Sequence, residues 1–122
     1  DEHGYSRGFV EDHIVPIGGS YASTQVFPGD KRFVMGASGH IAGVINPPAK
    51  NKRSHWIRAD GALPATHAEW LQGAQEHPGS WWEHWAAWLH QRSGPQIPSR
   101  DPLKGRLKPI EPAPGAYVKV KS

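Results

Sequence analysis

The sequence contains no cysteine among its 122 residues. This absence excludes a disulfide framework and a thiol nucleophile within the chain, and it favours a reducing, cytoplasmic setting. No apolar run is long enough to cross a bilayer, so we expect no transmembrane segment. The chain begins at Asp1, with neither an initiator Met nor the basic and apolar stretches of a signal peptide. We therefore expect a fragment of a longer protein.

Histidine is abundant, but the spacing of a metal site is missing. The eight histidines include no His-x-x-x-His pair and have no cysteine partners, so no metal site is expected. The formal net charge of +3 comes from basic residues that are mostly spread out. Aromatic residues do not interleave with the short basic clusters, which argues against nucleic-acid binding. The two clusters are Lys50, Lys52 and Arg53, and Lys104, Arg106 and Lys108.

Aromatic and turn-forming residues dominate what is present. Six Trp in so short a chain should supply much of its core, because each indole buries a large apolar area. The 14 Gly and 12 Pro indicate a folded chain rich in loops. The composition is therefore that of one small domain or part of one.

Apolar periodicity and turn residues predict strands and helices in alternation. Gly18-Gly19 should loosen the chain before the first helix, and the prolines after residue 94 favour an extended tail with a terminal strand around Tyr117 and Val118. The expected elements are strands over 5–10 and 31–35, helices over 20–26, 41–45, 67–75 and 81–93, and a basic loop over 50–58.

The last two of these helices carry local start signals. Thr66 with Glu69, and Ser80 with Glu83, have the spacing of a capping box. In the second helix Trp81, Trp85, Trp88 and Leu89 form one apolar stripe, which we interpret as a face packed on the sheet. The alternative is that exposed indoles contact an apolar surface, and Trp82, on another face, is the residue expected to be exposed.

Asp12 and His40 are the residues that could carry chemistry. Asp12 follows the first expected strand, and His40 lies 28 residues later, in a Gly-flanked loop after the next strand. This is the order of the last two triad members in α/β-hydrolases, where the acid orients the histidine that serves as base. Gly39 should let the loop turn tightly. From spacing alone the signal is weak, and a solvated Asp and a surface His are the simpler interpretation.

A series of longer motifs resembles the C-terminal part of class I polyhydroxyalkanoate synthases. The resemblance covers nearly the whole chain from Glu11, in order. The matching segments are EDHIVP (11–16), AST (22–24), RFV (32–34), GASGHIAGVINPP (36–48), KRSHW (52–56), GSWW (79–82) and EPAPGAYVK (111–119).

The resemblance implies an acyltransferase in which a cysteine attacks the thioester of an (R)-3-hydroxyacyl-CoA and carries the growing polyester. His40 matches the family's catalytic histidine and Asp12 its aspartate, whereas the cysteine lies outside this chain. His13 also matches a family position, where we expect a hydrogen-bonded neighbour of the active loop. Coenzyme A is part of the substrate, and no other cofactor is implied.

The resemblance also implies the architecture and the setting. We expect α/β structure: residues 1–94 should form the C-terminal part of an α/β-hydrolase catalytic domain, with the last strands of a mostly parallel sheet and the Trp-rich helices. Residues 95–122 should form an extended Pro-rich tail. The parent would act in the cytoplasm at polyhydroxyalkanoate granules, with the polyester and the granule surface as partners and a homodimer as a possible state.

Several alternatives stay open at this point. The chain could be a non-catalytic module that binds granules or a partner, or part of an α/β-hydrolase esterase, and the missing nucleophile would distinguish the latter. The cluster of Lys50, Lys52 and Arg53 could meet CoA phosphates, although a solvated loop is the simpler interpretation. Without its nucleophile, this chain alone should be inactive.

Overall fold

The computed structural model describes residues 3–121. Three single 3-10 turns, at Pro48–Lys50, Pro102–Lys104 and Tyr117–Lys119, accompany the strands and α-helices. In chain order, these are β1 (His3–Phe9), α1 (Ile17–Val26), β2 (Asp30–Gly36), β3 (Ser54–Ile57), α2 (His67–Gln72), β4 (Gln75–Pro78) and α3 (Trp82–His90).

The strands form one mixed sheet in the order β1-β2-β3-β4. β1 and β2 are parallel and are joined through α1, because parallel neighbours require a crossover connection. β3 and β4 continue the sheet in antiparallel pairings. Within the described residues, the expectation of a mostly parallel sheet is therefore met only by β1 and β2.

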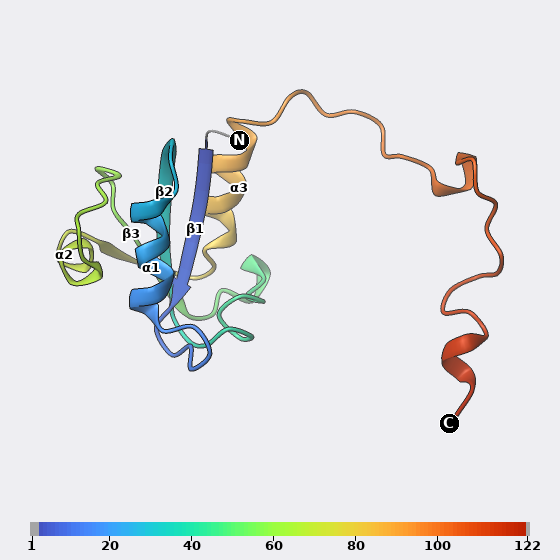
Figure 1. The fold of residues 1–122 in the computed structure, drawn as a ribbon, viewed down its shortest axis with the longest axis horizontal. Helices are drawn as coiled ribbons and strands as arrows, with labels where there is room; N and C mark the ends of the chain where they lie inside the picture. Colours follow the sequence, from blue (N-terminus) through green and yellow to red (C-terminus); the bar gives the residue numbers. More distant parts are fainter. Residues whose placement is uncertain (1–2, 122) are drawn as a thin grey trace.

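The core lies on both faces of β2, because successive side chains of a strand point to opposite sides. On one face Phe33 and Met35 pack with Tyr21 of α1 and Trp70 of α2. The ring of Phe33 meets that of Trp70 edge to face at a centroid distance of 4.9 Å. Helices α1 and α2 therefore cover this side of the sheet, as Figure 1 shows for α1.

The other face is covered from the start of α3. Val34 packs with Phe9 of β1 and with Trp81, which immediately precedes α3. Trp81 is only 4% exposed. Two tryptophans, Trp70 and Trp81, thus close opposite sides of the same strand, as expected from their abundance in so short a chain.

The two predicted helix starts have different outcomes. At α2 the capping box is present, with Thr66 accepting from the backbone N–H of Glu69 and Glu69 accepting from that of Thr66. At α3 the predicted box is wrong: the helix starts at Trp82 after Trp81, with no side-chain cap at that position. Ser80 still accepts a hydrogen bond from the backbone N–H of Trp82 at 3.1 Å.

Strands Tyr5–Val10 and 31–35 and the first helix are confirmed within a few residues, but other segments differ. Gly18 and Gly19 lie inside α1 instead of loosening the chain. The expected helix over 41–45 is a series of turns, with two helical hydrogen bonds. The expected basic loop contains β3, and the unexpected β4 pairs with it, because a neighbouring strand can satisfy backbone groups that local sequence leaves open.

The tryptophan stripe is only partly buried. Trp85 is 36% exposed. Trp88 is half-buried and packs edge to face on Tyr5, with 5.3 Å between the ring centroids. Trp82, expected to be exposed, is half-buried and donates its indole N–H to the carbonyl of Val44 at 2.8 Å. The prediction for Trp82 was wrong because the loop over 41–46 packs against that side of α3.

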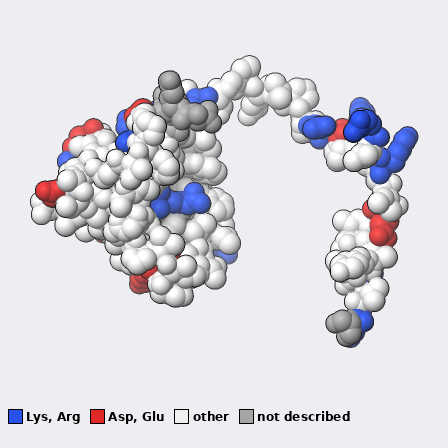
Figure 2. Space-filling view, in the orientation of Figure 1, with Lys and Arg blue, Asp and Glu red and all other residues white. Residues whose placement is uncertain are grey.

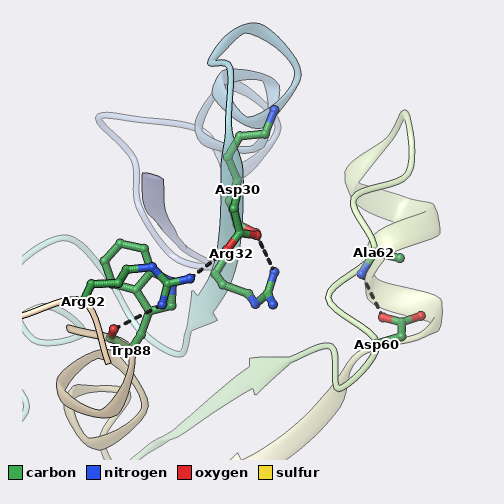
Figure 3. A network of polar contacts seen from close by, with 7 residues as sticks. Asp30, Arg32, Asp60, Ala62, Trp88 and Arg92 are labelled. Atoms are coloured by element: carbon green, nitrogen blue, oxygen red, sulfur yellow. Dashed lines mark hydrogen bonds and ion pairs between the residues drawn. The ribbon is translucent and has the colours of Figure 1, made fainter. Parts of the chain in front are cut away.

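A polar network joins the end of α3 to the start of β2 (Figure 3). Asp30 pairs with Arg32 at 3.1 Å and with Arg92 at 2.7 Å. The Arg92 guanidinium also lies over the ring of Trp88, 4.3 Å from its centroid. These contacts hold the residues just after α3 against the start of β2.

Residues 95–121 run away from the sheet as an extended, largely exposed tail (Figure 1). The predicted terminal strand at Tyr117 and Val118 is wrong, because these residues lie in an exposed 3-10 turn without a strand to pair with. Basic side chains gather on the tail around the turn Pro102–Lys104, as Figure 2 shows.

Candidate active site

Asp12 and His40 lie in the two loops that follow β1 and β2. Because these strands are parallel and in register to the pair Phe9 and Gly36, both loops leave the sheet at the same edge. The backbone N–H of Val10 donates to the carbonyl of Gly36 at 3.1 Å, and that of Glu11 to the carbonyl of Ser38 at 3.2 Å. The two loops are therefore tied together just before the candidate residues.

The structure brings the two side chains together. The Nδ1 atom of His40 lies 3.5 Å from Oδ1 of Asp12. The Asp12 side chain is 7% exposed and that of His40 is 32% exposed, so the carboxylate is the more buried member of the pair. Nδ1 is buried and has no hydrogen-bond partner among the described residues. A distance of 3.5 Å is longer than an ordinary hydrogen bond, so the two groups are close but not hydrogen-bonded to each other.

Local backbone contacts keep Asp12 ionised. Its Oδ1 accepts the backbone N–H of Ile14 at 2.8 Å and that of Val15 at 3.0 Å. The Val15 N–H, followed by that of Ile14, holds the pKa of the Asp12 carboxyl below its ordinary value, and the neighbouring His40 acts in the same direction. An ionised carboxylate beside an imidazole can orient the ring and stabilise its protonated form.

His13 lies beside His40, but it makes a ring contact in place of the expected hydrogen bond. Its ring meets that of His40 edge to face, at a centroid distance of 4.9 Å. The hydrogen bonds found among the described residues include none from the His13 side chain. His13 therefore borders the His40 ring on the solvent side of the loop.

The tight turn before His40 is made by Ser38, not by Gly39. Ser38 has a φ of 74°, in the left-handed region that non-glycine residues rarely occupy. Gly39 is needed for space instead, since an added Cβ would lie 3.2 Å from the carbonyl oxygen of Glu11. The GASGH motif contained this signal, but the sequence alone does not say which of its residues takes the positive φ.

The loop beyond His40 has supports that the sequence did not reveal. Gly43 is buried, and its N–H donates to the carbonyl of Gly39 at 2.8 Å. The carbonyl of Gly43 accepts the indole N–H of Trp81 at 3.0 Å. No local pattern links residues 38 positions apart, so only the folded chain reveals this contact.

Large apolar side chains are exposed on both loops of the site. Ile14 is 64% exposed, and Ile41 and Ile45 are each 65% exposed. Exposed apolar residues gathered in one region mark a surface that contacts an apolar ligand or another part of a protein. The site therefore combines the Asp12 and His40 pair with exposed apolar side chains on the same two loops, here called the apolar rim.

The basic cluster, possible metal ligands and possible membrane-spanning helices lie outside this site or are not found within residues 3–121. Lys50, Lys52 and Arg53 are solvent-exposed. No group of three or more potential metal-ligating His, Cys, Asp or Glu side chains is assembled within residues 3–121. None of the helices in this range combines the length and the apolar character needed to cross a membrane.

Comparisons with known proteins give the family. The chain is 55% identical over 119 residues to the poly(3-hydroxyalkanoate) polymerase subunit PhaC of Cupriavidus necator, covering 97% of this chain and 20% of that protein. It is 42% identical over 114 residues to the subunit PhaC of Rhizobium etli, covering 93% and 18%. The poly(3-hydroxyalkanoate) polymerase of Methylorubrum extorquens is 39% identical over 112 residues, covering 92% and 18%.

The chain spans about a fifth of the length of these curated relatives. No protein-family model matches it. The matched region nevertheless covers almost the entire chain. By sequence, the chain belongs to the poly(3-hydroxyalkanoate) polymerase family.

Proposed function

We propose that this chain supplies the histidine and aspartate of the active site of a longer polyester synthase. The parent would transfer (R)-3-hydroxyacyl groups from coenzyme A to a growing polyhydroxyalkanoate chain. The main support is the 3.5 Å approach of His40 Nδ1 to Asp12 Oδ1 at the ends of two parallel strands, in a chain whose relatives are polymerases.

In this proposal, His40 acts as the base. Its Nδ1 faces Asp12, so Nε2 is the nitrogen available to accept the proton of a cysteine thiol supplied from outside this chain. The thiolate attacks the acyl carbonyl of the thioester, the bond to the CoA sulfur breaks, and the CoA thiolate takes up a proton. The acyl group then remains on the enzyme as a thioester.

Elongation places a greater demand on the pair. The 3-hydroxyl of an acyl group must lose its proton to His40 as its oxygen attacks the enzyme-bound thioester, and the enzyme thiolate is released. An alcohol is a weaker acid than a thiol, so this step depends more on Asp12 stabilising the imidazolium. The pKa of Asp12 is held low, so the carboxylate is charged when it is needed.

The apolar rim is consistent with this substrate class. Ile14, Ile41 and Ile45 expose apolar surface beside the dyad, which suits an acyl or polyester chain better than a strongly charged ligand. Coenzyme A enters as part of the substrate, with no separate cofactor, and the parent would act at polymer granules in the cytoplasm. Since the nucleophile is outside the chain, residues 1–122 alone should release no CoA.

The test uses the full-length polymerase that contains this segment. His40→Gln should lower both single-turnover CoA release and steady-state polymerisation by roughly 10³-fold or more, because it removes the base. Asp12→Asn keeps a hydrogen-bonding group without the charge, so one acylation should persist while polymerisation stalls. His90→Gln, an exposed histidine at the end of α3, is the matched control and should behave like the parent.

Two results would refute the assignment: normal acylation by His40→Gln, or polymerisation at the parent rate by Asp12→Asn. Either would favour a non-catalytic module that binds granules or a partner. If the parent's nucleophile were serine and the products free acids, the chain would instead belong to an esterase. Product analysis in the same assay separates these outcomes.

A further inference from the structure

The backbone of the loop over 37–46 sets the position of His40, because the hydrogen bonds found within residues 3–121 include none from the His40 side chain. Its Nδ1 atom lies 3.5 Å from Oδ1 of Asp12, and this oxygen already accepts two backbone N–H groups. What fixes this loop therefore also fixes the distance between the base and its carboxylate.

The two ends of this loop are attached to β3 and to the segment just before it. Before His40, the N–H of Ala37 donates to the carbonyl of Ser54 at 3.0 Å. After it, the side-chain amide of Asn46, 6% exposed, donates to the carbonyl of Lys52 at 2.9 Å. These contacts, and the bond from the Glu11 N–H to the Ser38 carbonyl, all lie outside residues 41–45, so the middle of the loop needs a support of its own.

Two neighbouring indoles reach this middle section from the beginning of α3. Trp81 donates its ring N–H to the carbonyl of Gly43 at 3.0 Å, and Trp82 donates its ring N–H to the carbonyl of Val44 at 2.8 Å. The N–H of Gly43 in turn donates to the carbonyl of Gly39, next to His40, at 2.8 Å. A chain of hydrogen bonds therefore runs from Trp81 to the residue beside the base.

Packing makes this support rigid. Trp81 is 4% exposed and is held by Phe9 and Val34, with Val44 and Trp82 against the same cluster. The Phe9 ring fills the space beside Gly43, where an added Cβ would lie 2.6 Å from it. Leaving a buried carbonyl without a hydrogen-bond donor costs free energy. The folded chain is therefore more stable when the loop keeps its hydrogen bonds to these indoles.

We propose that Trp81 and Trp82 are positioning residues for His40, acting through the carbonyls of Gly43 and Val44. This inference rests on the proposed role of His40 as base. It assigns the start of the Trp-rich helix a part in the reaction in addition to its part in the core. The indole N–H groups donate to Gly43 and Val44 and not to Asp12 or His40, so their effect must pass through the loop.

The experiment removes the ring N–H while keeping the ring. In the full-length polymerase, Trp81 or Trp82 is replaced by 3-benzothienylalanine, in which sulfur takes the place of the indole N–H. Trp88, whose indole N–H is buried and has no hydrogen-bond partner within residues 3–121, receives the same replacement as the matched control. Thermal midpoints and single-turnover acylation capacity report the folded, active fraction of each variant.

We expect the replacements at Trp81 and Trp82 each to lower kcat roughly ten- to a hundredfold per active enzyme, since small misplacements of catalytic groups have effects of this size. KM should stay within about twofold, because the side chains of the apolar rim are themselves unchanged. The replacement at Trp88 should leave both constants unchanged. A purely structural role would change the folded fraction but not kcat per active site.

His40→Gln in the same assay distinguishes a failure of the proposed function from a failure of the positioning role alone. If His40→Gln retains activity, the proposed function fails, and the positioning role fails with it. If His40→Gln is inactive while the Trp81 and Trp82 replacements keep the parent kcat, only the positioning role is overturned. Equal losses at Trp81, Trp82 and Trp88 would also overturn it. If the buried Trp81 variant does not fold, the half-buried Trp82 variant still decides.

Discussion

Gly43→Ala is the substitution whose effect can be worked out most directly from the structure. An added Cβ would lie 2.6 Å from a ring carbon of Phe9, 2.7 Å from the carbonyl oxygen of Ala37 and 2.8 Å from that of Gly39. Ordinary contacts of this kind begin near 3.5 Å, so neighbouring groups must retreat by on the order of 0.7 Å. Two of the three atoms are backbone, so no side-chain rotation can make the space.

The cost should appear in stability and in rate. Overpacking of a close-packed site costs about 1–3 kcal/mol, and we expect the free energy of unfolding to fall by this amount. Because the displaced carbonyl of Gly39 is next to His40, kcat should fall roughly ten- to a hundredfold. Denaturant unfolding and steady-state polymerisation of the full-length polymerase measure the two effects.

Gly19→Ala is the control with the opposite expected sign. Gly19 lies inside α1, and an added Cβ would meet no atom within 4 Å. Alanine in an open helical position should stabilise by about 0.5–1 kcal/mol and leave polymerisation unchanged. If Gly43→Ala matched Gly19→Ala in both measurements, the prediction that close packing around Gly43 holds the His40 loop in place would be wrong.

Two further predictions concern stability. Thr66→Ala removes the cap of α2 and should lower the free energy of unfolding by about 1 kcal/mol in denaturant titrations, and an unchanged value would mean that the capping box contributes nothing. Burial lowers the pKa of His55, His67 and His84 below their ordinary value of 6.5, so the unfolded chain binds protons more readily. The free energy of unfolding should therefore be highest above pH 6.5 and decline as the pH falls below it. Denaturant titrations at about pH 7.5 and about pH 5.5 would measure this difference. A greater free energy of unfolding at the lower pH would contradict the lowered pKa values of these histidines.

Elements with strong local signals were predictable from the sequence. The capping box of Thr66 and Glu69 forms as expected, because both partners lie within one helical turn. Strand β2 was predicted from an apolar run between turn residues, and it forms with four buried residues at its end. Strands β3 and β4 were missed because their pairing satisfies backbone groups across the sheet, and no short stretch of sequence encodes that partner.

The sequence by itself determined the family of this chain and the order in which Asp12 and His40 follow two neighbouring strands. Both are properties of residue order, which motifs and periodicity record directly. Only the tertiary structure decided that the two side chains meet at 3.5 Å, that Ser38 takes the strained turn, and that the indoles of Trp81 and Trp82 bind the His40 loop. The physical reason is that such contacts join groups brought together by the packing of the whole sheet, whereas sequence patterns report what a residue does within a few positions of itself.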